Sequence, residues 1–233
     1  MMPFNAMRLR GGGQKDPYFA NVVALLHFNG ADASTTFTDV ITKTWTPAGN
    51  AQIDTAQSKF GGASGLFDGT GDLLTTPSIA GLNLASATAF TIECWVRMNS
   101  LAANSTIVYK RSEGADNGGY ELQITASGQV SYAAANGASV STTSTATGLI
   151  TTGQWYHVAL SNDAGGAHRI YIDGVQRASA TLTLTTSTFQ LKIGSAFSGA
   201  RNFNGWIDDL RITNGTSRYA VAFVPPGAAF PDS

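Results

Sequence analysis

The fold is decided by the stretch Phe90-Thr91-Ile92-Glu93-Cys94-Trp95-Val96-Arg97-Met98, in which apolar and polar residues alternate. Every second residue from Phe90 to Met98 is apolar, so in an extended chain these side chains fall on one face. The opposite face carries Thr91, Glu93, Trp95 and Arg97. This two-residue period predicts a β-strand with one face in the protein core.

Similar short runs recur along the chain. They cover residues 22–28, 120–124, 156–160, 170–175 and 203–213. Asp173-Gly174 within 170–175 is a typical hairpin turn that separates two strands, and Gly-, Asn- and Ser-rich turns separate the other runs. No stretch keeps a helical apolar period beyond a turn or two. The sequence therefore predicts an all-β jelly roll of two antiparallel sheets packed face to face.

Two details of this fold are open to test. Ala133–Thr152, rich in Ala, Ser, Thr and Gly, suits either a long loop or a polar strand pair. The alternating runs also predict which residues lie between the sheets: Phe90, Ile92, Val96, Val158, Leu160, Ile170, Ile172, Leu210 and Ile212.

Composition excludes several classes of protein. A chain of 233 residues is ordinary for one large β-sandwich. Its net charge of -1 gives no general attraction to nucleic acid or to anionic membranes. The single cysteine, Cys94, excludes an intramolecular disulfide. No segment approaches the roughly 20 apolar residues of a membrane span, and the N-terminus lacks the apolar run of a signal peptide.

Residues 1–17 stand apart from the strands. They contain three consecutive glycines, two prolines and several basic residues, so we expect an N-terminal arm before a sandwich over 18–233 that ends in a Pro-rich tail. Such an arm is either a flexible tail or a segment docked on a neighbouring chain, where contacts recover the entropy cost of ordering it. In the docked case, Arg8, Arg10 and Lys15 pair with acidic groups of another protein or of a second copy. The arm therefore predicts assembly, including a homo-oligomer.

Residues 90–96 also resemble the F-T-[IL]-E-x-W-[VI] strand of laminin-G-like domains in the concanavalin A-like lectin/glucanase superfamily. Four further segments match the family's motifs in the expected order: Phe67–Gly69, Trp155–Ala159, Ile170–Gly174 and Gly205–Ile212. The resemblance implies two curved antiparallel sheets.

A narrower resemblance lies near both ends of the sandwich. The segments Leu26–Gly30, Ser58–Gly62, Arg218–Tyr219, Phe223–Pro226 and Phe230–Pro231 are similar to a subgroup found in structural proteins of tailed bacteriophages. Members usually have Asp at the position of Asn29, where this chain departs from the pattern. The resemblance implies a virion protein, either a capsid decoration or head fibre or a tail component, with other virion proteins as partners. The alternative is a lectin or adhesin whose main role is attachment to host glycans.

Catalysis is not expected. Glucanases of this superfamily carry an E-x-D-x-x-E or E-x-D-x-E motif on one strand, because retaining hydrolysis needs two carboxyl groups. The only glutamates, Glu93, Glu113 and Glu121, lie in no such motif, and the histidines show no metal-ligand spacing. We therefore assign no catalytic or cofactor-binding residue, and a degenerate glycosidase is disfavoured.

One acid suggests a metal site. Asp208 shares its strand face with Leu210 and Ile212, and a carboxylate on a buried face needs a cation, an arginine or several N–H donors. Asp32 follows the first strand, and the first and last strands of such sandwiches often lie side by side. A structural Ca²⁺ held by Asp32 and Asp208 and an Asp208 satisfied by the protein alone are equal alternatives.

The aromatic residues leave a second alternative open. They suit either a sugar-stacking platform or the core: Trp45, Trp95, Trp155, Trp206, Tyr120, Tyr132 and Tyr171.

Overall fold

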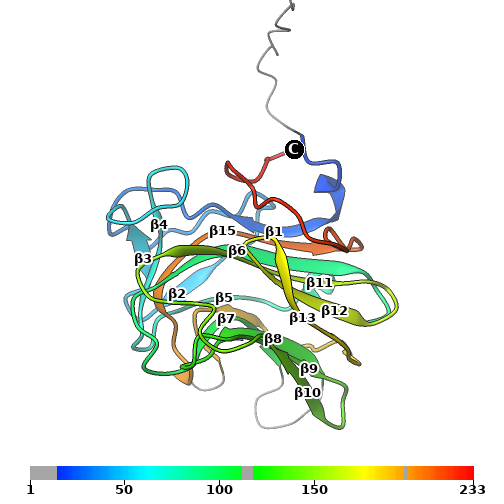
Figure 1. Ribbon diagram of the computed structural model, residues 1–233. Coiled ribbons are helices and arrows are strands. Elements are labelled where there is room, and N and C mark those ends of the chain that lie inside the picture. Colours follow the sequence, from blue (N-terminus) through cyan, green and yellow to red (C-terminus); the bar gives the residue numbers. More distant parts are fainter. Residues whose placement is uncertain (1–14, 112–117, 197–198) are drawn as a thin grey trace, which may run out of the picture.

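The computed structural model describes residues 15–111, 118–196 and 199–233. They form two antiparallel sheets packed face to face (Figure 1). The eight-stranded sheet contains β1 (Val22–Leu26), β3 (Gln52–Asp54), β4 (Ser64–Asp68), β6 (Phe90–Met98), β11 (Trp155–Asn162), β12 (Ala167–Ile172), β13 (Val175–Thr181) and β15 (Asn204–Asn214). The seven-stranded sheet contains β2 (Thr46–Ala48), β5 (Leu73–Thr76), β7 (Ser105–Arg111), β8 (Gly119–Ile124), β9 (Val130–Ala135), β10 (Val140–Ser144) and β14 (Leu191–Ile193).

The strand order brings the first, the fold-deciding and the last strands into one sheet. β6, the stretch that decides the fold, lies between β11 and β15 in the eight-stranded sheet. β1 pairs with β15, so the first and last strands lie side by side as expected. The helices with described bounds are two 3-10 turns, Phe19–Asn21 and Ala80–Leu82. None of the described helices is long and apolar enough to cross a membrane. The predicted all-β sandwich is confirmed.

The predicted core is also confirmed. All nine residues expected between the sheets are at most 3% exposed. Cys94 shares their face of β6 and is fully buried. The strand-pair interpretation holds for residues 133–144, where β9 and β10 form an antiparallel hairpin, whereas residues 145–150 form no strand. β9 is buried along its whole length, whereas β10 is largely exposed.

The last residues of the chain return across the outer face of the eight-stranded sheet. We call residues 215–233 the tail; it lies on the same side of the molecule as the first described residues (Figure 1). The backbone N–H of Asp16 donates to the carbonyl of Ser233 at 2.8 Å. Asp16 therefore packs with the sandwich, although the sequence placed it in the arm. Residues 1–14 of the predicted arm lie outside the described residues.

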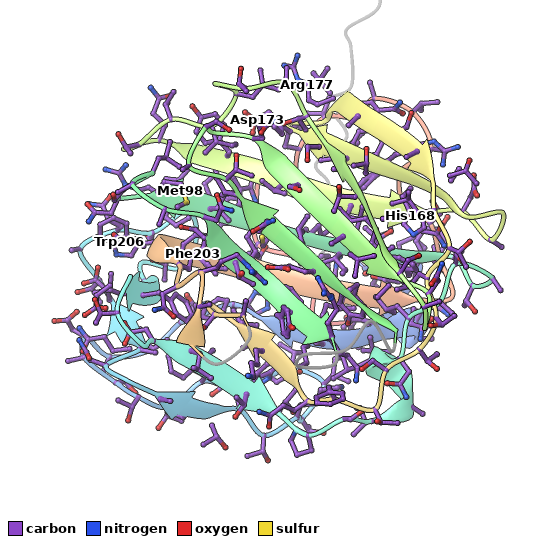
Figure 2. All side chains as sticks on the ribbon, turned by 90° about the horizontal axis from the view of Figure 1, so that it is seen from below. Met98, His168, Asp173, Arg177, Phe203 and Trp206 are labelled. Atoms are coloured by element: carbon purple, nitrogen blue, oxygen red, sulfur yellow. The ribbon has the colours of Figure 1, made fainter. Side chains whose placement is uncertain are left out.

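The two ends of the sandwich are distinct. Seen from below, Met98, Phe203 and Trp206 gather at one end and His168 lies at the other (Figure 2). Phe203 packs edge-on against Phe67, and His168 packs against Phe90 at the start of β6. These aromatic contacts therefore lie at opposite ends of the core.

Candidate functional site

The outer face of the eight-stranded sheet is closed by the tail through buried ion pairs. Arg211 donates from Nε and Nη2 to Oε1 of Glu93, at 3.0 and 2.8 Å, and from Nη1 to Asp16 at 3.0 Å. Arg218 of the tail donates from Nη1 and Nη2 to the two carboxylate oxygens of Asp16, at 2.9 and 2.7 Å. The hydroxyl of Tyr219 donates to Oε2 of Glu93 at 2.7 Å. Burial raises the pKa of Glu93, but Arg211 and His157 outweigh it and lower that pKa to about 2.

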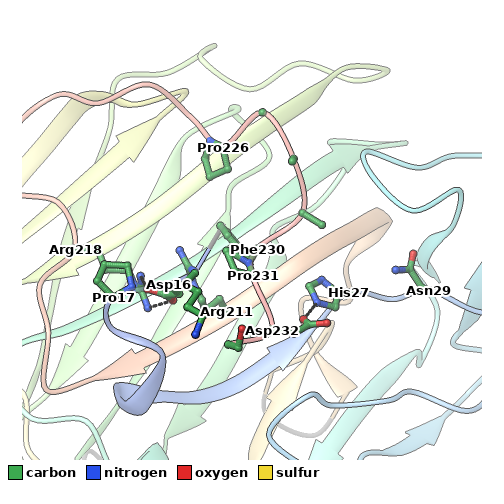
Figure 3. A pocket seen from close by; sticks show the side chains of 15 residues that line it. Asp16, Pro17, His27, Asn29, Arg211, Arg218, Pro226, Phe230, Pro231 and Asp232 are labelled. Carbon is green, nitrogen blue, oxygen red and sulfur yellow. Dashed lines mark hydrogen bonds and ion pairs between the residues drawn. The ribbon is translucent and has the colours of Figure 1, made fainter. Parts of the chain in front are cut away.

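A second set of contacts holds the end of the tail. Nδ1 of His27 lies 2.5 Å from Asp209, and its Nε2 lies 2.7 Å from Asp232 of the tail (Figure 3). Burial lowers the pKa of His27, but the two carboxylates outweigh it and raise that pKa to about 9. Phe230 donates its N–H to Asp209 and lies under the Arg211 guanidinium, 3.7 Å from the ring centroid. The tail is thus an integral part of the fold.

A cavity of about 820 Å³ opens beneath the tail, lined by Lys15–Pro17, His27, Asn29, Arg211, Arg218 and residues 226–233 (Figure 3). The guanidinium groups of Arg211 and Arg218 are already paired with Asp16 and Glu93. These two arginines therefore serve the protein's own structure.

The outer face of the seven-stranded sheet carries a different feature. A cavity of about 400 Å³, which we call the groove, is lined by Tyr109, Arg111, Thr188, Phe189, Gln190 and Lys192. Tyr109 and Arg111 are alternate residues of β7, and Lys192 of β14 lies directly opposite Tyr109. The segment 187–190 leads into β14, and its Phe189 is 38% exposed. An exposed ring beside hydrogen-bonding side chains is a typical small-ligand surface.

Buried ion pairs stabilise the sheet next to the groove. Glu121 of β8 lies opposite Tyr109 and is 2% exposed. Arg201 binds both of its oxygens, at 2.8 and 3.0 Å, and the Thr106 hydroxyl donates at 2.9 Å. Arg111 lies 3.7 Å from the same carboxylate. These contacts make Glu121 a structural anchor of the groove wall.

Comparison with known proteins identifies the fold family. The sequence model of the concanavalin A-like lectin/glucanases superfamily matches residues 68–218, well over half of the chain. The chain belongs to this superfamily. No curated protein matches it.

Solved structures share the fold of this superfamily member. The binding domain of Paraclostridial Mosquitocidal Protein 1 aligns with a TM-score of 0.66 and 16% identity, over 87% of this chain and 50% of that one. The binding domain of botulinum neurotoxin G aligns at 0.63 and 16% identity, over 86% and 49%. The chain thus spans about half the length of these toxin domains. Domain 4 of the arabinanase AbnA from Geobacillus stearothermophilus, in complex with arabinotriose, aligns at 0.63 and 22% identity, over 84% and 94%.

The carboxylate pair of the superfamily's glucanases has no counterpart among the described glutamates. Glu93 lies on the outer face of the eight-stranded sheet, whereas Glu121 lies on that of the seven-stranded sheet. Glu113 lies outside the described residues. Glu93 and Glu121 therefore cannot act on one glycosidic bond.

The two residues predicted to hold calcium have separate partners. Buried Asp208 accepts the backbone N–H groups of Lys59 and Phe60 at 2.7 and 3.0 Å. Exposed Asp32 accepts the N–H and hydroxyl of Thr55 at 3.0 and 3.2 Å. Among the described residues, no hydrogen bond joins the two acids, and no three His, Cys, Asp or Glu residues are grouped to hold a metal. Burial raises the pKa of Asp208 to about 7. The calcium site stays a prediction.

The predicted assembly residues are only partly described. Arg8 and Arg10 lie outside the described residues, and exposed Lys15 lies at the rim of the cavity beneath the tail. Their role in assembly stays a prediction.

Three of the seven aromatic candidates, Trp45, Tyr120 and Tyr132, belong to the core, and Trp95 and Tyr171 are buried on the outer face of the eight-stranded sheet. Five of the candidates are each at most 5% exposed: Trp45, Trp95, Tyr120, Tyr132 and Tyr171. Trp155 and Trp206 are half-buried on the eight-stranded sheet, flanking Arg97. The exposed ring of the groove, Phe189, was missed because Thr185–Gln190 has no alternating pattern; its only sequence signal is one aromatic residue in a polar segment.

Proposed function

We propose that this superfamily member is a non-enzymatic, lectin-like domain that binds a glycan in the groove of the seven-stranded sheet. The observation that carries the proposal is Phe189, an exposed ring bordered by Thr188 and Gln190 in a cavity of about 400 Å³. A sugar ring presents an apolar face to an aromatic side chain and hydroxyl groups to polar ones. The groove supplies both kinds of contact side by side.

The arrangement of the two sheets supports this choice of face. The tail and Asp16 cover much of the outer face of the eight-stranded sheet, and both ends of the described chain lie there (Figure 1). The groove lies on the opposite sheet. A protein attached through its termini would therefore present the groove outward.

We further propose that the chain is a virion component of a tailed bacteriophage, in a capsid decoration, a head fibre or the tail. Most of the segments that carry the narrower resemblance hold the tail on the sandwich: His27 contacts Asp232, and Arg218, Tyr219, Phe223 and Phe230 belong to the tail itself. Tyr219 and Phe223 stack with ring centroids 3.5 Å apart, and Phe230 lies under Arg211. A Cβ atom at Gly61 would lie 2.0 Å from the Asn29 side-chain oxygen, so glycine is needed there. This packing supports attachment of the protein to the virion through the face on which both ends of the described chain lie.

A glycan array on the intact protein tests the proposed ligand. Arabino-oligosaccharides and sialylated glycans are suitable first probes, because similar folds have been solved with arabinotriose and with N-acetylneuraminic acid. We expect selective binding without release of new reducing ends. Absence of selective binding would contradict glycan recognition, and release of reducing ends would contradict the non-enzymatic assignment.

A further inference from the structure

Lys110 is a fully buried lysine between two residues of the groove. Its neighbours on β7, Tyr109 and Arg111, line the groove on the outer face of the sheet. Because side chains alternate along a strand, Lys110 points to the inner face instead. Its side chain is 0% exposed. A buried ammonium group is costly unless acceptors replace the water that it loses.

The acceptors of Lys110 come mainly from the segment that carries Phe189. Its Nζ donates to the carbonyl of Ser187 at 2.8 Å, to the carbonyl of Phe189, and to the hydroxyl of Ser78 at 2.9 Å. An ammonium group has three hydrogens, so these three acceptors match its donors. Burial lowers the pKa of Lys110 to about 8, which still leaves most of it protonated at neutral pH.

We propose that Lys110 is a positioning residue of the groove, which ties the backbone of residues 187–189 to β7 and so presents Phe189 and Gln190 to the ligand. The glycan part of this inference rests on the proposed function, whereas the positioning does not. The segment has few restraints of its own: Thr188, Phe189 and Gln190 are all exposed, and the Phe189 N–H bonds only locally, to the Ser187 hydroxyl at 3.2 Å.

Positioning of this kind favours binding because it lowers the entropy cost of ordering the site. A ring that is already held at the groove edge loses little freedom when a ligand stacks on it. Charge-assisted hydrogen bonds to backbone carbonyls are stronger than neutral ones. Lys110 therefore orders the groove residues Phe189 and Gln190 from the inner face of the sheet and does not contact the ligand itself.

Chymotrypsin cleavage after Phe189 tests this without any ligand. Lys110→Met keeps a side chain of similar length and removes all three donors, so the segment should loosen. We expect cleavage after Phe189 to become at least about tenfold faster, equivalent to about 1.4 kcal/mol of lost local order. Cleavage after Phe223 in the tail is the internal reference and should not change. Lys59→Met is the matched control, since Lys59 lies over Trp95 on the other sheet.

A second variant keeps the inference falsifiable if Lys110→Met fails to fold. Ser78→Ala removes one acceptor and should raise cleavage after Phe189 about threefold, as expected for loss of a single hydrogen bond. Unchanged cleavage in Lys110→Met, or in Ser78→Ala where the first variant does not fold, would overturn the positioning role. If the wild-type protein binds no glycan, the proposed function fails, but the cleavage result still decides the role of Lys110. If it binds one, Lys110→Met should weaken that binding about tenfold.

Discussion

At the scale of single residues, His27 couples the end of the tail to pH. Its folded pKa of about 9 lies above the ordinary value of 6.5, because Asp209 and Asp232 flank the ring. A base with a raised folded pKa stabilises the protein fully below its unfolded pKa, and this stabilisation is lost as the pH rises through the folded pKa.

We therefore predict that the protein loses stability between pH 6.5 and pH 10 through His27. After allowance for solvent screening, a loss of about 1 kcal/mol corresponds to about 2–4 °C in melting temperature for a chain of this size. Calorimetry of the wild type and of His27→Gln isolates this group from others that titrate in the range. An equal slope in both proteins would show that the His27 contacts contribute nothing.

Asp208 provides the test for calcium. Its folded pKa of about 7 is raised, so the folded state binds the proton more tightly, and the stability from this group is lost as the pH rises from about 4 to 7. Bound Ca²⁺ would compensate the buried charge above pH 7. A site at 100 times its dissociation constant adds about 2.7 kcal/mol. We predict a higher melting temperature with calcium than with chelator at pH 7.5, and no difference in Asp208→Asn. Equal melting temperatures in the wild type would rule the site out.

At the scale of elements, the tail depends on a buried charge network. Removing one partner of a buried ion pair leaves an uncompensated charge, which costs about 3–5 kcal/mol. Arg211→Met would remove the two shortest cationic contacts of Glu93. Arg218, at 3.8 Å, and His157, at 3.3 Å, would remain, so the loss should lie at the lower end of this range. We predict a loss of this size in denaturant unfolding. Arg177→Met, at an exposed position of β13, is the control and should change stability by less than about 0.5 kcal/mol.

The same elements show what the sequence could predict. Ile170 and Ile172 were placed in the core because a strand repeats every two residues, which is a local property. The contact of Asp16 with Arg211 joins residues 195 positions apart, and no local pattern predicts such a pair. Lys110 interrupts the apolar inner face of β7, but its acceptors lie 32 to 79 residues away. The groove was missed because half of its lining, Thr188–Gln190, lies in a loop without an alternating pattern, and no local pattern predicts where the Pro-rich tail packs.

At the scale of the whole molecule, the two outer faces differ. The tail covers one of them (Figure 1). The groove lies on the other. The predicted arm starts from the covered side, where Asp16 is bonded to Arg211 and Arg218. A truncation that tests the arm must therefore stop before Asp16.

We predict that deletion of residues 1–14 leaves the β circular dichroism spectrum unchanged and abolishes incorporation into virus particles or breaks the homo-oligomer. The physical reason is that Arg8 and Arg10 would lose their acidic partners on the neighbouring chain. Occupancy in purified particles, measured by mass spectrometry, and oligomeric state, measured by light scattering, are the readouts. Wild-type occupancy and oligomeric state after truncation would show that the arm is not the anchor.

Glycan affinity of Phe189→Ala tests the central claim most directly. Calorimetric titration with the strongest ligand from the array, or with arabinotriose as first probe, compares three proteins: wild type, Phe189→Ala, and the control Val221→Ala in the exposed tail. Loss of a stacking ring should weaken binding at least about tenfold, equivalent to about 1.4 kcal/mol, and the control should bind as the wild type does. Equal affinity of Phe189→Ala and wild type would contradict a glycan site in the groove.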